Sequence, residues 1–278
     1  MRIAVEHRTE YRFSAPVFLE PHEFRFRPRS NAWQRLDRFD LLLSPEASGS
    51  TANLDVGGNE VLAAWFTGLT DHLTIDVRFE VQTLRTNPFD FVPPHQDGLP
   101  MDYVDELRSL LLPYTRQEPQ PALREYAEAV SEGAAHAASS FAADLARRLH
   151  TDSRHVVRPE GAPRPPEETL RSAEGACRDL ATLYVALCRE VGLAARFVSG
   201  YCLAEEAERD ELHAWAEVYL PGGGWRGFDP STGLAVADRH VAVAAGPDYT
   251  LAAPVSGQFR GEATADPLHS SVTIRRTG

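Results

Sequence analysis

The stretch Gly175-Ala176-Cys177-Arg178-Asp179 stands directly ahead of a run whose apolar residues recur at helical spacing. The apolar positions of that run are Leu180, Leu183, Tyr184, Leu187, Cys188 and Val191. Such offsets mark one buried helical face, so Cys177 is predicted to lie at a helix N-terminus. The unpaired N–H groups and positive dipole end of a helix stabilise a thiolate there, which is the form of cysteine that acts as a nucleophile. A cysteine that simply packs fits the same pattern, so the interpretation depends on its companions.

The first companion is a histidine on a predicted strand. From Leu212 to Leu220, apolar residues alternate with His213, Trp215, Glu217 and Tyr219, which is the period of a strand with one apolar face. A strand packed on the helix would bring the His213 imidazole within hydrogen-bonding reach of the thiol, as a general base requires. Trp215 shares the face of His213 and is expected to shield it from water, and Glu217 is expected to add polarity nearby.

The second companion is an aspartate on the following strand. The turn from Leu220 to Gly224 joins the histidine strand to the segment that ends at Asp229, so the two are predicted to pair as an antiparallel hairpin. Asp229 would then lie beside His213 and fix the tautomer of its imidazole. An Asp-Pro pair alone is an ordinary turn, but the order of the three residues and their elements predicts a triad of Cys177, His213 and Asp229.

These segments resemble the transglutaminase-like superfamily, whose catalytic core is papain-like. The similar stretches are Gly175 to Asp179, Ala194-Ala195-Arg196-Phe197-Val198-Ser199-Gly200-Tyr201, His213-Ala214-Trp215 and Gly227-Phe228-Asp229-Pro230. The resemblance covers about Ser140 to Tyr249 and implies Cys177 as nucleophile, His213 as base and Asp229 as the orienting acid. The opening Met1 to Tyr11 and Pro28-Arg29 also resemble the N-terminal β region of the bacterial transglutaminase-like cysteine protease subfamily.

The residue after the cysteine separates this chain from one branch of that family. Animal transglutaminases carry a Trp there, whereas this chain has Arg178, so protein crosslinking is not supported. Arg178 followed by Asp179 resembles the bacterial subfamily, where hydrolysis of an amide or peptide bond is implied; both are candidates for the cleft or its surroundings. His240 and Tyr249 match positions that recur in the family, and both a substrate-side role and a structural role remain open for them.

The pattern along the chain predicts an α+β fold with three parts. Residues 1–86 alternate in short stretches separated by breakers and are expected to form an antiparallel β-sandwich. Residues 87–137 are expected to form a linker and a helical region; the linker is rich in proline and aromatic residues, and its His95 is interpreted as a loop residue. Residues 138–278 are expected to form the catalytic core, in which the cysteine-bearing helix packs on an antiparallel sheet, together with C-terminal strands.

Composition limits the classes of function. The formal net charge of −12 is spread along the chain and disfavours nucleic acid as a partner. No run approaches the roughly 18 apolar residues that cross a bilayer, so we expect a cytoplasmic protein without a membrane partner. Cys188 and Cys202 are interpreted as core residues, and three cysteines without close pairing predict neither a zinc site nor a disulfide framework.

The resulting hypothesis is a cysteine-dependent amide or peptide bond hydrolase that forms a thioester and needs neither metal nor cofactor. The backbone N–H of Cys177 is the expected oxyanion donor. Two alternatives stay open: a non-catalytic peptide-binding or assembly module, and an acyl-transfer subunit of a multi-protein system. For the latter, the resemblance implies an ATP-grasp-type protein as partner. The chain contains no lysine, so it cannot crosslink its own copies through lysine amines.

Overall fold

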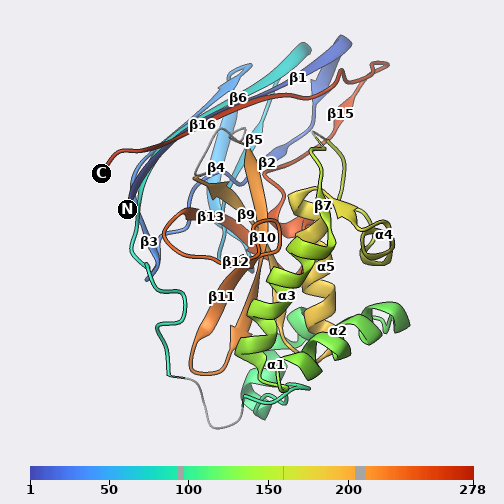
Figure 1. The fold of residues 1–278 in the computed structure, drawn as a ribbon. Coiled ribbons are helices and arrows are strands. Elements are labelled where there is room, and N and C mark those ends of the chain that lie inside the picture. Colours follow the sequence, from blue (N-terminus) through green and yellow to red (C-terminus); the bar gives the residue numbers. More distant parts are fainter. Residues whose placement is uncertain (93–96, 159, 204–210) are drawn as a thin grey trace.

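The computed structural model describes residues 1–92, 97–158, 160–203 and 211–278 of the chain. It has a mixed fold in which antiparallel sheets are combined with helices, which confirms the predicted fold class (Figure 1). His95, interpreted above as a loop residue, lies outside the described residues.

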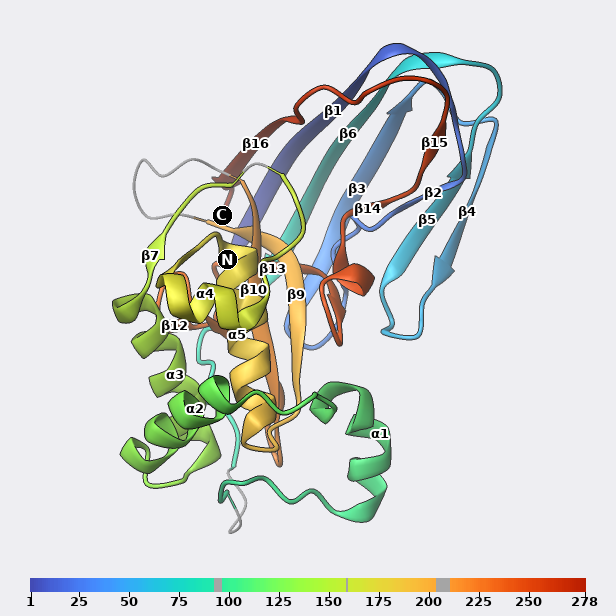
Figure 2. The same ribbon diagram turned by 90° about the vertical axis from the view of Figure 1, so that its right-hand side faces the viewer.

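The N-terminal region consists of antiparallel strands, as predicted. Its elements are β1 (Arg2–Leu19), β2 (His22–Phe24), β3 (Gln34–Ser44), β4 (Gly49–Leu54), β5 (Glu60–Trp65) and β6 (Thr70–Thr83). In one sheet β6 lies between β1 and β3, and in a second sheet β5 lies between β2 and β4. Both sheets occupy the same half of the molecule (Figure 2). On β6, every second residue from Ile75 to Val81 is buried, because alternate side chains of a strand point to opposite faces.

Strands from the end of the chain complete these two sheets. They are β14 (Val255–Ser256), β15 (Phe259–Arg260) and β16 (His269–Arg276). β16 pairs with β1 from Glu10 to Ile3, β15 pairs with the end of β1, and β14 pairs with β2. The C-terminal strands, which the sequence grouped with residues 138–278, are therefore hydrogen-bonded to the N-terminal region.

The helical part follows the linker. Its elements are α1 (Asp105–Thr115), α2 (Pro121–Gly133), α3 (Ala138–Asp152), the short strand β7 (Arg154–His155), α4 (Pro166–Ser172), the short strand β8 (Glu174–Gly175) and α5 (Cys177–Glu190). α2 ends at Gly133, and α3 begins at Ala138. Among the described residues, no helix is long and apolar enough to cross a membrane.

The second half of the chain builds one antiparallel sheet. Its strands are β9 (Ala195–Cys202), β10 (Leu212–Leu220), β11 (Gly224–Asp229), β12 (Leu234–Ala235) and β13 (His240–Gly246), and a 3-10 turn, η1 (Thr250–Ala252), follows. The order in the sheet is β12-β11-β10-β9-β13, so the predicted hairpin of β10 and β11 is confirmed. α5 packs on β9 and β10, and α2 and α3 pack against α5 (Figure 1). Leu183 of α5, Phe141 of α3 and Phe228 of β11 share one buried cluster there.

The two halves of the molecule share a hydrophobic core. Tyr201 of β9 and Val241 and Val243 of β13 are buried in the same cluster as Val5 and Phe79 of the N-terminal sheet. Burial of large apolar side chains stabilises such a contact by roughly 1.5–3 kcal/mol per side chain. The N-terminal sheet is therefore packed on the sheet that carries His213 and Asp229.

Candidate active site

The start of α5 is fixed by an aspartate one turn into the helix. Asp179 is fully buried, and its carboxylate accepts the backbone N–H of Ala176 at 2.8 Å. Nη1 of Arg158 donates to both of its oxygens, each at 2.7 Å. A third donor is the backbone N–H of Arg164 at 2.8 Å. An acidic residue that caps the first free N–H groups stabilises a helix start. Asp179, a cleft candidate from the sequence, thus lies beneath the helix start and holds it in position.

Gly175 is required by the same close packing. A Cβ on Gly175 would lie 2.9 Å from the Cβ of Asp179, closer than side-chain carbons approach each other. The Gly-x-Cys-x-Asp spacing therefore combines a residue without a side chain, the helix start at Cys177 and the buried cap. No hydrogen bond from the Cys177 backbone N–H is formed within the described part of the chain, as expected for the first residue of a helix.

Two imidazoles lie beside the Cys177 thiol and interact with it. One belongs to His213 of β10, as the sequence predicts, and the other to His155 of β7. Burial alone would raise the pKa of Cys177, but the hydrogen bonds from His155 and His213 lower it to about 7. Close to neutral pH a substantial fraction of this thiol is therefore ionised.

Sequence reasoning missed His155. This residue reaches the site because β7 and β8 form a two-residue parallel bridge that sets His155 opposite Gly175, two residues before Cys177. So short a pairing leaves no periodic pattern in the sequence. The one available signal is a histidine at the start of a proline-rich stretch, residues 154–166, that leads to the nucleophile.

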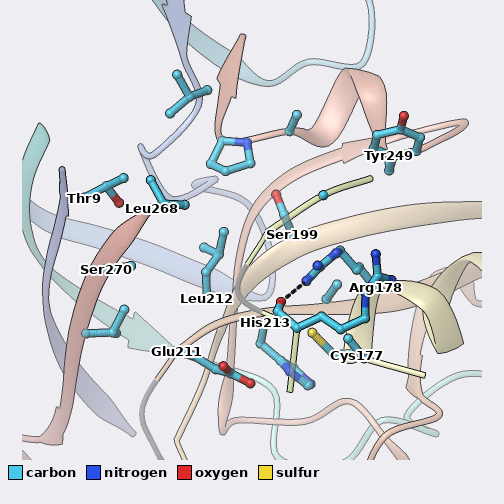
Figure 3. A pocket seen from close by; sticks show the side chains of 18 of the residues that line it. Thr9, Cys177, Arg178, Ser199, Glu211, Leu212, His213, Tyr249, Leu268 and Ser270 are labelled. Atoms are coloured by element: carbon cyan, nitrogen blue, oxygen red, sulfur yellow. Dashed lines mark hydrogen bonds between the residues drawn. The ribbon is translucent and has the colours of Figure 1, made fainter. Parts of the chain in front are cut away.

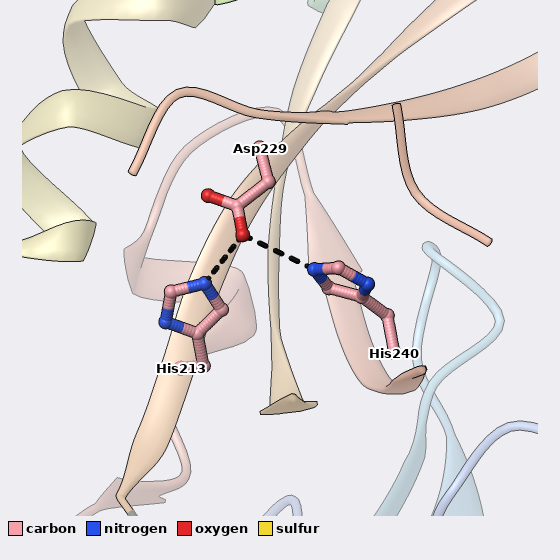
Figure 4. Close-up of side chains that lie close together, drawn as sticks. All are labelled: His213, Asp229 and His240. Carbon is pink, nitrogen blue, oxygen red and sulfur yellow. Dashed lines mark hydrogen bonds and ion pairs between the residues drawn. The ribbon is translucent and has the colours of Figure 1, made fainter. Parts of the chain in front are cut away.

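Asp229 connects two further imidazoles. Its Oδ2 lies 2.8 Å from His213 Nε2 and 3.1 Å from His240 Nε2 (Figure 4), and its Oδ1 accepts the backbone N–H of Ser231 at 2.9 Å. Since Nε2 of His213 faces Asp229, Nδ1 is the ring nitrogen that remains for Cys177. The structure thus brings together Cys177, His213 and Asp229 and adds His240 to the same carboxylate.

The pKa values of Asp229, His213 and His240 depend on one another. Burial would raise the pKa of Asp229, but the His213 and His240 imidazoles hold it well below its usual range. Burial opposes the protonation of His213, yet the charge and hydrogen bond of Asp229 raise its pKa well above the ordinary value. For His240 the same balance of burial and its bond to Asp229 gives a pKa of about 8. The His213 imidazolium and the Asp229 carboxylate therefore form a buried ion pair.

The same three side chains are the one group of potential metal ligands found among the described residues. One ligand atom each of His213, Asp229 and His240 lie within 4.8 Å of one another. Imidazole and carboxylate suit zinc. However, both oxygens of Asp229 already accept N–H groups, so the hydrogen bonds account for the arrangement without an ion.

Trp215 covers the ion pair. Its ring centroid lies 6.2 Å from that of His213 and 5.1 Å from that of His240, and the side chain is buried. Gly200 on β9 makes room for it, because a Cβ there would lie 2.7 Å from the Trp215 ring. The predicted shielding of the imidazole from water matches this placement.

The remaining candidates divide between the cavity and the sheet. Arg178 and Tyr249 both line the cavity described below, and Arg178 donates to the carbonyl oxygens of Arg158 and Glu160. Glu217 does not line this cavity and pairs instead with Arg196, with its Oε2 2.7 Å from Arg196 Nε. The expectation that Glu217 adds polarity beside His213 therefore has no contact to support it.

A cavity of about 680 Å³ opens at the thiol and extends to the N-terminal sheet. Its lining includes Cys177, Glu211 and His213 at one end, and Thr9 of β1 and Ser270 of β16 at the other (Figure 3). The far end is polar, since buried His7 bonds to Tyr201 Oη at 2.7 Å and to Thr9 Oγ1 at 2.8 Å. Both halves of the molecule thus line the space next to the candidate nucleophile.

Comparison with known proteins finds a matching family, related sequences and a similar fold. Residues 124–230 match the family model of the transglutaminase-like superfamily, and residues 3–82 match the bacterial transglutaminase-like N-terminal region. An uncharacterized protein of Mycobacterium tuberculosis is 30% identical over 92% of this chain and 87% of its own length. One of Mycobacterium leprae is 24% identical over 95% of each chain. A crystal structure from Cytophaga hutchinsonii, named "Putative Cysteine Protease", covers 100% of this chain and 92% of its own, with a TM-score of 0.72 at 18% identity.

Proposed function

This chain belongs to the transglutaminase-like superfamily, and we propose that it hydrolyses amide or peptide bonds through a thioester formed on Cys177. The observation that carries the proposal is the position of His213, which lies beside the Cys177 thiol on one side and bonds to the Asp229 carboxylate at 2.8 Å on the other. A thiol, a base and a group that orients the base are the three parts of this type of nucleophilic catalysis.

The first half of the reaction uses the thiolate. In the reacting form the proton of the Cys177 thiol has already passed to His213, and the thiolate attacks the carbonyl carbon of the amide beside the imidazolium. The free N–H of Cys177 at the start of α5 supports the negative charge that develops on the carbonyl oxygen. The C–N bond then breaks, the imidazolium of His213 gives its proton to the amine nitrogen, and the acyl group remains on sulfur as a thioester.

The second half uses water. His213, now neutral, accepts a proton from the water molecule as its oxygen attacks the thioester carbonyl. The C–S bond breaks, the carboxylic acid leaves, and His213 keeps the proton, so that the pair of thiolate and imidazolium is restored. Asp229 stays ionised throughout, since its pKa is held low, and it compensates the positive charge of His213 in both halves.

The same thioester would react with an amine to give a new amide. We propose hydrolysis because Arg178 follows the nucleophile where the crosslinking enzymes of the family carry a Trp. The chain also lacks lysine, so its own copies offer no side-chain amine as acceptor.

The test is digestion of a peptide library prepared from a whole proteome by the wild-type protein and by Cys177→Ala. We expect new peptide ends, detected by mass spectrometry, with the wild-type protein only. Addition of a fluorescent primary amine separates the two fates of the thioester, since transfer attaches the amine to the acyl product. Identical digests from the two proteins would refute the proposal, and peptides retained without cleavage by both would favour a binding module.

A further inference from the structure

A carboxylate that has no partner among the described residues lies at the nucleophile end of the cavity. Glu211 precedes β10 by one residue and lines the cavity with Cys177 and His213. Figure 3 shows its side chain at the same end of the cavity as these two residues. It is partly exposed, and it forms no hydrogen bond or ion pair with any residue that the structure describes.

The other acidic groups of the site are compensated. Asp179 pairs with Arg158 and Asp229 with His213. Arg178 is close enough for the charge of Glu211 to raise its pKa, but its guanidinium donates to the backbone carbonyls of Arg158 and Glu160. Within the part of the chain that the structure describes, no group uses the hydrogen-bonding capacity of the Glu211 carboxylate, which is thus available to a molecule in the cavity.

The position of Glu211 opposes the chemistry of Cys177. A negative charge near a thiol disfavours the thiolate, and Glu211 accordingly acts to raise the pKa of Cys177. The hydrogen bonds of His155 and His213 have to overcome this effect as well as burial. An unpaired carboxylate at this place lowers the reactivity of Cys177 in the empty site. Any favourable contribution of Glu211 to the reaction therefore has to come from a contact with bound substrate.

We propose that Glu211 binds a cationic group, an ammonium or a guanidinium, carried by the amine side of the substrate amide. The inference rests on the proposed hydrolase function and specifies the charge of the substrate on its amine side. Glu211 and His213 are two residues apart at the start of a strand, and residues at this spacing point to the same face. Because His213 passes its proton to the leaving amine, the amine part of the substrate is expected to bind beside His213.

A bound cation would also remove the opposition to the thiolate. Once Glu211 is paired, its charge no longer disfavours ionisation of Cys177, so binding of the correct substrate and activation of the nucleophile favour each other. Partial exposure of Glu211 means that salt screens the attraction, and the preference for cations should weaken as ionic strength rises.

The first experiment needs no known substrate. Aminoethyl, hydroxyethyl and sulfonatoethyl methanethiosulfonate are cationic, neutral and anionic reagents that share one reaction. The Cys177 thiolate attacks the sulfenyl sulfur, a mixed disulfide forms, and methanesulfinate leaves. Rates are followed by mass spectrometry on the peptide that contains Cys177, so that modification of Cys202 does not contribute.

We expect the cationic reagent to react at least about tenfold faster than the anionic one, relative to their rates with a free thiol, which corresponds to roughly 1.4 kcal/mol. Glu211→Gln should remove most of this ratio, and Glu211→Asp should keep part of it. The control is Glu167→Gln, which removes one exposed carboxylate on α4 and should leave the ratio unchanged. An equal ratio in the wild-type protein and in Glu211→Gln would overturn the inference.

The second experiment separates recognition from a general electrostatic field. Quenched fluorescent peptides carry Lys, Arg, norleucine or Glu directly after the cleaved bond, and kcat and KM are measured for each. We expect KM to be lowest for Lys and Arg, and Glu211→Gln to raise KM for these two peptides but not for norleucine. Cleavage without any charge preference would refute the inference alone, whereas cleavage that persists in Cys177→Ala would refute the proposed function.

Discussion

His240 Nε2 lies 3.1 Å from Asp229 Oδ2, the same oxygen that accepts His213 Nε2 at 2.8 Å. One buried carboxylate oxygen therefore holds two imidazoles, one from β10 and one from β13. Strand β13 lies on the other side of β9 from β10, so His240 connects the edge of the sheet to its centre. In this arrangement His240 positions Asp229 and has no described contact with Cys177.

The shared carboxylate makes stability depend on pH. The pKa of His240 is about 8 in the folded protein, above its ordinary value of about 6.5 in an unfolded chain. The stabilisation is thus fully present below about pH 6.5 and is lost as pH rises through about 8, and it amounts to about 2 kcal/mol at most. His240→Gln retains an N–H donor but no charge. Urea denaturation should show a smaller loss of unfolding free energy between about pH 6 and about pH 9 for this variant than for the wild-type protein.

The control for that experiment is His269→Gln, since His269 is exposed. Its dependence of stability on pH should equal that of the wild-type protein. If His240→Gln lost as much free energy between the two pH values as the wild-type protein does, His240 would not be protonated in the folded state.

The reactivity of Cys177 with iodoacetamide should follow its lowered pKa. We expect the rate to rise with pH and to reach half of its maximum near pH 7, because the pKa of the thiol is about 7. Cys188 serves as an internal control, since it is fully buried and burial raises its pKa. Peptide mass spectrometry should find Cys177 labelled and Cys188 unlabelled in the folded protein. A midpoint near about 8.5, the value of a free cysteine, would contradict an activated thiol.

Both imidazoles beside the thiol should contribute to that low pKa. His155→Gln and His213→Gln are each expected to raise the pKa of Cys177 by about one unit, which lowers the rate of alkylation at neutral pH about fivefold. The matched control is His72→Gln in the N-terminal sheet, which should leave the rate unchanged. An unchanged pH profile in His155→Gln would show that this imidazole only packs beside the site.

The pKa of His155 provides a second test of its contact with Cys177. The hydrogen bond to Cys177 is the main cause that raises the pKa of His155. Conversion of Cys177 to its S-methylthio form removes the thiolate, so NMR titration should find a lower pKa for His155 after the modification. A merely structural histidine would titrate identically in both forms.

The sequence predicted those parts of the site that have a local signature. Cys177 precedes a periodic helical face, and His213 and Asp229 lie on two strands joined by a glycine-rich turn, so the helix start and the hairpin followed from neighbouring residues. The expected packing of that helix on the antiparallel sheet, which agrees with the family resemblance, is confirmed by the contact of α5 with β10.

Other parts depend on contacts between distant residues. β16 and β1 pair although they lie at opposite ends of the sequence, as in the bond of His7 to Ser270. Antiparallel pairing of segments so far apart in sequence leaves no local pattern. Glu217 shows the converse error. Alternation correctly sets it on the face of His213, but four residues of strand span about 13 Å, and its carboxylate therefore meets Arg196 instead of the imidazole.

From the sequence, Asp179 was a candidate for the cleft or its surroundings, and its burial leads to the last prediction. Asp179→Asn removes the charge that compensates Arg158. It also leaves one acceptor oxygen for the donors that share two carboxylate oxygens in the wild-type protein. Loss of one partner of a buried ion pair costs about 3–5 kcal/mol, and because the Arg158 side chain is 25% exposed, we expect about 3 kcal/mol. Urea denaturation measures this loss, with Asp144→Asn as the control, since its partner Arg147 is largely exposed and the pair contributes at most about 1 kcal/mol.

The same variant should also change the reactivity of the thiol, because the Asp179 carboxylate holds the Ala176 N–H at the helix start. We expect Cys177 to be alkylated more slowly in Asp179→Asn, even where the variant remains folded. Equal stability and an equal rate would show that the helix start does not depend on this cap.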